Sequence, residues 1–507
     1  MTKRRTSSIF VMAGGGMQSL IVGLQSIILI PIYVRQVGER LYGAWLGSGD
    51  VLSWMLVSDL GITNLVIQKV AAAHGAGDER DVGRWFASGT AVVAAICAIL
   101  CAVGIGASFA FPRIFGLQGA EADALRRTFV LATVSTSVVI LHTAFYGYAR
   151  GVQRTGLLSA TTVVSTLLQF AISLVLALRG FGLLAIGYGF VARAVVQVIG
   201  MAIFFAREVP AGVRANLRVD REVLRELGRT VPATAVAGFA FAAMNQSELL
   251  IVSLLVGPAA AAVFMLNRKA IELARALSDS VTFGTYGAYA HLVASADRGR
   301  ALNVYREILS VRTALAVLMA AGYVALNRSF VSVWVGPEKY VGLTLTALFA
   351  VQSIMAGNAF LANYLYRAAG FIVEGSMLLL AESVLRVGLM VGLCLWLGLP
   401  GVPLAGIASG AVFLLVTHRK LRAFCLGFQA ADRPISPAFW GVCAGLLAAC
   451  VALGAGYMSR HWLYVFGAGS GILALGAVAL APTNAYLARY RAAVASRLPM
   501  LRGAAAP

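Results

Sequence analysis

One apolar stretch of membrane-spanning length, residues 259–286, carries a row of ionisable side chains. Those that share one helical face, at intervals of four, three and four residues, are Arg268, Glu272, Arg275 and Asp279, with Lys269 beside them. Such a face is too costly to lie against lipid. It predicts either intrahelical ion pairs that neutralise each other or the wall of a cavity that receives an anion. We favour the cavity wall, because buried ion pairs alone contribute little stability.

Other apolar stretches also contain ionisable residues at mid-membrane depth. They are Arg193 in the sixth stretch, Glu382 and Arg386 in the eleventh, and Asp59 in the second. Each alone would suit a hydrogen bond between neighbouring helices. Together with the charged face they predict a wet, net-cationic cavity, in which the paired donors of arginine would match phosphate or pyrophosphate oxygens. The candidate substrate-binding residues are therefore Arg193, Arg268, Lys269, Arg275 and Arg386. The candidates for coupling or charge pairing are Asp59, Glu272, Asp279 and Glu382.

Motifs for catalysis and cofactor binding are missing from the sequence. It contains no Walker A loop, no H-E-x-x-H and no G-x-S-x-G, and its five histidines are scattered. The six cysteines have no metal-ligand or disulfide spacing. We expect no catalytic residue, no metal and no cofactor, so the protein is expected not to be an enzyme.

The elements that position the charged residues are membrane-spanning helices. Hydrophobic residues make up 60% of the chain and charged residues only 12%, with a mean hydropathy of +0.83, which excludes a soluble globular protein. Since a span needs about 20 apolar residues, the sequence predicts an all-α polytopic membrane protein with about 14 transmembrane helices. The expected spans lie near 10–34, 43–67, 86–110, 126–148, 157–178, 183–206, 231–256, 259–286, 311–334, 342–366, 375–398, 402–418, 437–457 and 462–482.

Lys and Arg gather in every second connection between these spans. The chain has 41 of them against 21 Asp and Glu, a formal net charge of +20. Basic residues are retained in cytosolic loops, so the pattern places both termini in the cytosol. We interpret the positive charge as orientation charge, some of it in contact with anionic lipids, and not as a nucleic-acid footprint.

The longest loop separates two groups of six spans. We expect an N-terminal six-helix lobe at 1–206, an amphipathic cytosolic linker at 207–230 and a C-terminal six-helix lobe at 231–418. An additional helix pair at 437–482 and a basic cytosolic tail at 483–507 follow. Short runs that recur in the two groups indicate an internal repeat, as in many transporters.

The opening of the chain resembles a known family. The matching residues are Ile30-Pro31-Ile32-Tyr33, Gly38, Tyr42-Gly43 and Trp45, then Ser58-Asp59-Leu60-Gly61-Ile62, then Gly75-x-Gly77-Asp78. They look like the polysaccharide (O-antigen type) flippases of the multidrug/oligosaccharidyl-lipid/polysaccharide (MOP) exporter superfamily. The arrangement of six, six and two spans is similar over the whole length.

The resemblance implies a MATE/MOP-like fold and a location in the bacterial inner membrane. Such proteins move undecaprenyl-pyrophosphate-linked oligosaccharide repeat units across that membrane by alternating access, for lipopolysaccharide or exopolysaccharide biosynthesis. The implied partners are the lipid-linked oligosaccharide, membrane lipids and other polysaccharide assembly proteins, with no nucleic acid.

Three alternatives stay open at this point. An ion-coupled multidrug or cation antiporter of the same superfamily would have more carboxylates than arginines in its cavity, and this chain has the reverse. A membrane-embedded polysaccharide polymerase or ligase would need large outer loops, whereas the longest outer loop here is about 111–125 on the span count. A non-catalytic scaffold is disfavoured, because the intramembrane charges would then serve no purpose.

The orientation has a direct test. Cysteine introduced at Gln118 is expected to react with an impermeant thiol reagent in intact cells, because the 111–125 loop lies outside. Cysteine at Ala505 is expected to react only after the cells are opened. Labelling of Ala505→Cys in intact cells would contradict the topology.

Overall fold

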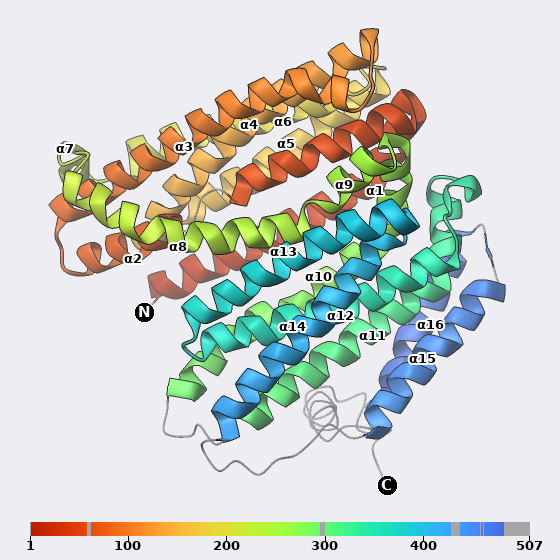
Figure 1. The fold of residues 1–507 in the computed structure, drawn as a ribbon. Helices are drawn as coiled ribbons and strands as arrows, with labels where there is room; N and C mark the ends of the chain where they lie inside the picture. The colour runs from red at the N-terminus through yellow and green to blue at the C-terminus, as the bar shows by residue number, and fades with distance from the viewer. Residues whose placement is uncertain are drawn as a thin grey trace. The chain divides into compact units, whose positions relative to one another are not determined.

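A computed structural model describes residues 2–480 apart from 58–61, 295–299, 427–436, 457 and 460. Throughout this part of the chain the regular elements are helices, as the sequence predicts (Figure 1). Their contacts divide the chain into two compact units, Met1–Ala262 and Val263–Pro507. The predicted basic tail at 483–507 lies outside the described residues.

The first unit is a bundle of long helices with two short ones. Its elements are α1 (Thr2–Val57), α2 (Ile62–Gly75), α3 (Glu79–Ile114), α4 (Gly119–Gly151), α5 (Gly156–Leu178), α6 (Leu184–Glu208), α7 (Ala211–Ala215), α8 (Arg221–Asn245) and α9 (Glu248–Leu255). A break divides α1 at Gly38, where φ is 76° and ψ is 165°. Glycine adopts that conformation at little cost.

The second unit holds the remaining helices. Its elements are α11 (Ala301–Trp334), the 3-10 helix η2 (Pro337–Lys339), α12 (Leu343–Ala368), α13 (Ile372–Leu397), α14 (Gly401–Leu426), α15 (Pro437–Gly456) and α16 (Trp462–Leu480). The long helix α10 (Pro258–Ala294) begins in the first unit and continues into the second.

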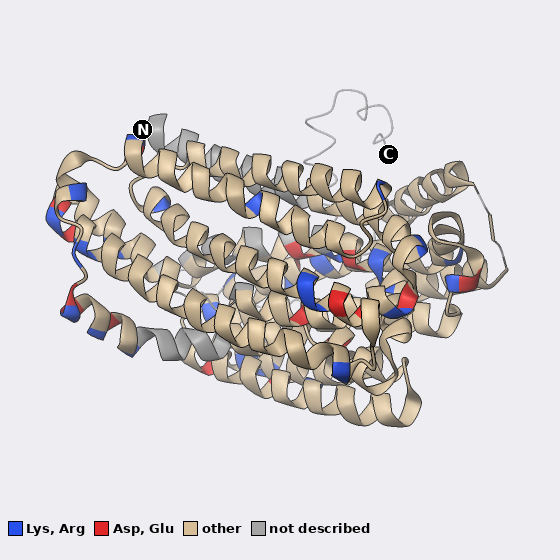
Figure 2. Cartoon of the chain, turned by 90° about the horizontal axis from the view of Figure 1, so that it is seen from above, with Lys and Arg blue, Asp and Glu red and all other residues tan. Residues whose placement is uncertain are grey.

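Eleven of the described helices are long and apolar enough to cross a membrane, and a twelfth span results if α8 and α9, which are bent by 49°, count together. Long stretches of the helices carry no Lys, Arg, Asp or Glu (Figure 2). The two remaining predicted spans can also be traced. The helix α1 is counted as one span, although it covers two predicted ones, 10–34 and much of 43–67. The helix α10 covers the predicted span 259–286 but is not counted among the eleven, and it contains the row of charged residues.

The break between α8 and α9 is held by α1. Asp50 Oδ2 accepts a hydrogen bond from the N–H of Leu250 at 2.9 Å, near the start of α9. Ser253 Oγ donates to the Gly43 carbonyl oxygen at 3.3 Å. A carboxylate at a helix N-terminus satisfies N–H groups that the break leaves without a helical partner. Through these contacts the expected seventh span, 231–256, packs against α1 in the first unit. The lobe boundaries expected at 206 and 231 stay a prediction.

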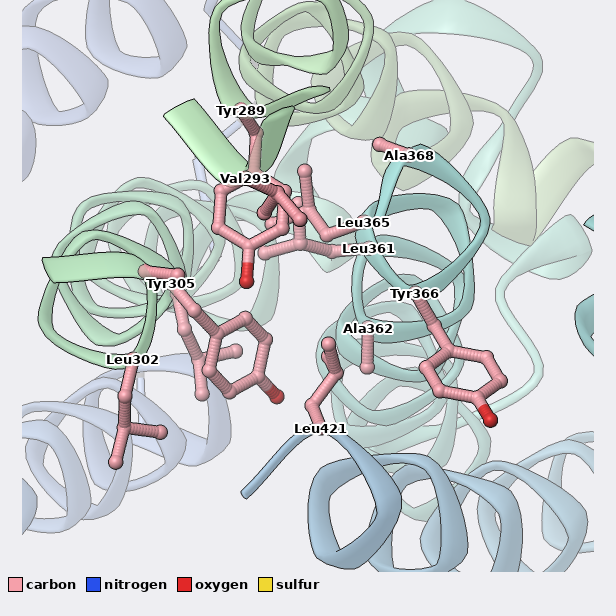
Figure 3. Packing of buried hydrophobic residues seen from close by; sticks show 12 residues of the cluster. Tyr289, Val293, Leu302, Tyr305, Leu361, Ala362, Leu365, Tyr366, Ala368 and Leu421 are labelled. Atoms are coloured by element: carbon pink, nitrogen blue, oxygen red, sulfur yellow. The ribbon is translucent and has the colours of Figure 1, made fainter. Parts of the chain in front are cut away.

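Buried side chains fix the helices of the second unit against one another. Tyr289 of α10, Tyr305 of α11, Leu361 and Leu365 of α12 and Leu421 of α14 are almost fully buried in one cluster (Figure 3). Between helices in a membrane, close van der Waals packing of such side chains stabilises the contact. The cluster therefore sets the register of α10, α11 and α12, which carry the site described next.

Candidate functional site

The charged face of α10 meets a neighbouring helix within the second unit. Arg275 Nε lies 3.3 Å from Asp279 Oδ2, an ion pair between residues four apart on the predicted face. The other carboxylate oxygen, Asp279 Oδ1, accepts a hydrogen bond from Arg312 Nη2 on α11 at 2.8 Å. One carboxylate therefore bridges two guanidinium groups, one from its own helix and one from the next.

Arg312 is the buried centre of this site, with 0% of its side chain exposed. Its other terminal nitrogen, Nη1, donates to Asn358 Oδ1 on α12 at 2.7 Å. Asn358 Nδ2 in turn donates to Thr313 Oγ1 at 3.0 Å. Hydrogen bonds with a charged partner are roughly twice as strong as neutral ones. One cation thus ties α10, α11 and α12 together.

Gly357 makes room for the Arg312 guanidinium. A Cβ atom at Gly357 would lie only 2.6 Å from Arg312 Cζ, closer than real Cβ atoms approach other atoms. The arginine is enclosed on every side, so it could not move away without losing its hydrogen bonds. A glycine at this position is therefore a condition for the buried cation.

The rest of the charged face is also paired or stacked. Lys269 Nζ lies 3.6 Å from Glu272 Oε2, and the Arg268 guanidinium lies over the Phe264 ring, 5.8 Å from its centroid. The four cations of the site are Arg268, Lys269, Arg275 and Arg312, and its two carboxylates are Glu272 and Asp279. The site is therefore net cationic.

Exposure decreases along the site from Glu272 to Arg312. The side-chain exposure is 47% for Glu272, 35% for Arg275, 18% for Asp279 and 0% for Arg312. Exposed ionised side chains in the middle of a membrane helix require water or a partner around them. The arrangement supports binding of an anion at Arg275, with Arg312 held as a fixed positive charge behind it.

Arg193 lies in the first unit, on α6. Its Nη1 donates to Gln169 Oε1 on α5 at 3.4 Å, a long hydrogen bond, and its Nε is buried without a hydrogen-bond partner among the described residues. Arg193 and the α10 cluster belong to different units. The single cavity that the sequence predicts for all the candidate cations stays a prediction.

The other predicted site residues lie on α13 or outside the described part of the chain. Glu382 and Arg386 are buried four residues apart on α13, which packs against α12 and α14. Two opposite charges at this spacing attract each other along a helix. Asp59 lies outside the described residues.

Sequence reasoning missed Arg312 and Asn358. The expected span begins near residue 311, which places Arg312 at its cytosolic end and not among the candidate site residues. The helix α11 begins ten residues earlier, at Ala301, and its first turns bury Leu302, Tyr305 and Leu309. The repeat of these residues at intervals of three and four was the signal that the helix extends past the apolar run.

A family model and several solved structures match this chain. A family model described as polysaccharide biosynthesis protein matches residues 53–341, more than half of the chain. A comparison with curated proteins gives no significant match. Among solved structures, an inward-facing multidrug resistance MATE family transporter of the MOP superfamily has a TM-score of 0.62 at 15% identity, over 80% of this chain and 95% of that one.

Two further solved structures show the same fold. The outward-facing conformation of a multidrug resistance MATE family transporter of the MOP superfamily has a TM-score of 0.56 at 14% identity, over 84% of this chain and 96% of that one. A MOP superfamily transporter from Pyrococcus furiosus Vc1 (DSM3638) has a TM-score of 0.53 at 14% identity, over 85% and 96% of the two chains. These findings confirm the MATE/MOP-like fold that the sequence predicts.

Proposed function

Because this chain belongs to the polysaccharide biosynthesis protein family, we propose that it flips undecaprenyl-pyrophosphate-linked oligosaccharide repeat units across the bacterial inner membrane. The family and the fold together make it a multi-pass transporter of the MOP superfamily. The finer proposal adds the substrate, the membrane, the cytosolic location of both termini, and a role in lipopolysaccharide or exopolysaccharide biosynthesis.

The observation that carries the proposal is the net-cationic site around Asp279. A pyrophosphate headgroup presents several anionic oxygens, and guanidinium groups bind such oxygens with paired N–H donors. Arg275 is accessible and shares its carboxylate partner with the buried Arg312. An entering pyrophosphate would take over Arg275 while Asp279 stays bound to Arg312, so no buried charge loses all its partners.

The polarity of the site argues against a cation or drug antiporter. A cationic substrate would be repelled by four cations with only two carboxylates among them. Polarity is a meaningful discriminator in this superfamily, because for the Pyrococcus furiosus transporter the reverse polarity of the binding pocket suggests a different function. The charge of the α10 site therefore favours an anionic substrate.

Transport by alternating access requires two states, one open to each side, that are both populated. The solved transporters with this fold include an inward-facing and an outward-facing conformation. We propose that this chain alternates in the same way and acts as a transporter, not as a polymerase or a ligase.

Reconstitution tests the proposal directly. The purified chain in proteoliposomes is expected to move a fluorescent undecaprenyl-pyrophosphate-linked sugar between leaflets, which a membrane-impermeant quencher measures. Undecaprenyl phosphate carrying the same dye but no sugar is the comparison lipid. Proteoliposomes that accumulate an organic cation but do not flip the lipid-linked sugar would establish the antiporter instead.

Alanine at Arg268 or Arg275 is expected to abolish transport while the protein still reaches the membrane. Each change removes a cation from the charged face of α10. Lysine at the same position is expected to restore transport only in part, since it lacks the paired donors of arginine. Complementation of a flippase-deficient strain measures the effect, with protein level checked by immunoblot. Normal polymer production by both alanine variants would exclude the α10 face as the substrate site.

A further inference from the structure

The first turns of α8 are docked onto α2 and α3 by ion pairs. Arg84 of α3 lies 3.1 Å from Asp220 and 3.3 Å from Glu222, and Lys69 of α2 lies 2.6 Å from Glu226. The backbone N–H of Asp220 also donates to Ser88 Oγ at 3.0 Å. These contacts fix which side of α8 faces the first unit.

Every carboxylate of the segment 207–229 is engaged with a cation from outside the segment. Besides the three just described, Glu208 lies 3.4 Å from Arg154 in the turn after α4. The Arg84 guanidinium and the N–H of Glu222 lower the pKa of Asp220, so this carboxylate stays ionised at neutral pH. The ion pairs of these four carboxylates are thus directed at cations outside the segment and not at its own arginines.

Six arginines of the same segment are exposed. They are Arg207, Arg214, Arg218, Arg221, Arg225 and Arg229. No ion pair joins any of them to another residue within the part of the chain that the structure describes. Basic and acidic residues gather at the left end of the helices in Figure 2.

Three of these arginines form one line along α8, which we name the arginine stripe: Arg221, Arg225 and Arg229. They follow one another at intervals of four residues, and the buried Val223 and Leu227 lie on the opposite side of the helix. The helix thus turns its apolar side to the unit and its arginines directly away from it.

The arginine stripe ends where the uncharged part of α8 begins. Residues 230–245 of the same helix contain no Asp, Glu, Lys or Arg. At 1.5 Å per residue the stripe extends over about 12 Å. The headgroup zone on each side of the roughly 30 Å hydrocarbon core is about 5–8 Å deep. With the hydrocarbon core beginning after Arg229, Arg225 and Arg229 would lie at headgroup depth and Arg221 just beyond it.

We propose that the arginine stripe binds the phosphate groups of anionic phospholipids in the cytosolic leaflet. Arginine at this depth gains from the negative potential of that leaflet and from paired hydrogen bonds to phosphate oxygens. The ion pairs with Arg84 and Lys69 serve the same end, since they direct the neighbouring carboxylates toward α2 and α3. The site holds α8 at the membrane surface, at the start of the span that α9 completes.

Lipid titration of the purified full-length chain, followed by native mass spectrometry, tests this site. The wild type is expected to bind dioleoyl phosphatidylglycerol at least tenfold more tightly than dioleoyl phosphatidylcholine. The triple variant R221Q/R225Q/R229Q is expected to lose that preference, because each arginine near the surface contributes about a fivefold gain in binding. The variant R221K/R225K/R229K keeps the charge and is expected to retain much of it.

The matched control is R35Q/R113Q/R179Q, which removes three exposed arginines from the predicted outer side of the same unit. It changes the net charge equally and is expected to leave the preference for phosphatidylglycerol intact. An equal loss in the control, or no loss in the stripe variant, would overturn the proposal. So would a stripe that binds polyprenyl pyrophosphate but shows no preference for phosphatidylglycerol, since the ligand would then be the substrate headgroup.

Discussion

Replacing Arg312 with alanine is expected to abolish export of the lipid-linked sugar and to destabilise the second unit. The change removes the buried partner of Asp279 Oδ1 and the donor to Asn358 Oδ1. Removal of one partner from a buried ion pair costs about 3–5 kcal/mol, because the other charge stays buried. Complementation of a flippase-deficient strain measures export, and the midpoint of thermal unfolding in detergent measures stability.

Arg312→Lys separates the two effects. Lysine keeps a positive charge beside Asp279 but lacks the fork that reaches Asn358 as well. We expect normal membrane levels, near-normal thermal stability and export reduced at least about tenfold, which corresponds to 1.4 kcal/mol. Arg328→Ala on the same helix is the control and is expected to export normally. Full export by Arg312→Ala at wild-type protein level would show that the buried cation takes no part in transport.

Helical periodicity places residues that are three or four positions apart on one face of α10. The ion pairs of Lys269 with Glu272 and of Arg275 with Asp279 have this spacing. Local spacing cannot predict which residue of another helix completes the site. Asp279 and Arg312 are separated by 33 positions and meet only through the packing of α10 on α11.

Hydropathy predicted the spans but concealed two features of the helices. The apolar run defined the start of a span at residue 311, while the helix itself begins at Ala301. The first ten residues of α11, 301–310, are amphipathic. Their mean hydropathy is too low for a predicted span, although one side of this segment is buried. For this reason Arg312 was predicted at a helix boundary and lies well inside α11 instead.

The second concealed feature is the bend between α8 and α9. The sequence predicts one span over 231–256, whereas the helix is interrupted near Gln246 and bends by 49°. The interruption is stabilised by Asp50, a residue about 200 positions earlier in the chain. The break falls in the polar run Asn245-Gln246-Ser247-Glu248, but nothing in that run shows that a carboxylate from α1 would cap the second half of the span.

Gly357→Ala is expected to reproduce much of the Arg312→Ala phenotype without changing any charged residue. The new Cβ would lie 2.6 Å from Arg312 Cζ and force the guanidinium out of its hydrogen bonds with Asp279 and Asn358. Overpacking of this kind costs about 1–3 kcal/mol. We expect a lower unfolding midpoint and export reduced at least about tenfold, the effect of 1.4 kcal/mol.

Combining the two changes shows whether the glycine acts through the arginine. In the Arg312→Ala background the methyl group at position 357 meets no guanidinium, so Gly357→Ala is expected to cost no further stability. The two effects are then strongly non-additive, as for residues in direct contact. Gly322→Ala on α11 is the matched control, because a Cβ there meets no atom within 4 Å. It is expected to leave export unchanged and to stabilise the helix slightly. An equal loss of stability from Gly357→Ala with and without Arg312 would contradict this. Gly357 would then serve only the packing of α12, and the Arg312 guanidinium would not depend on the absence of a side chain at position 357.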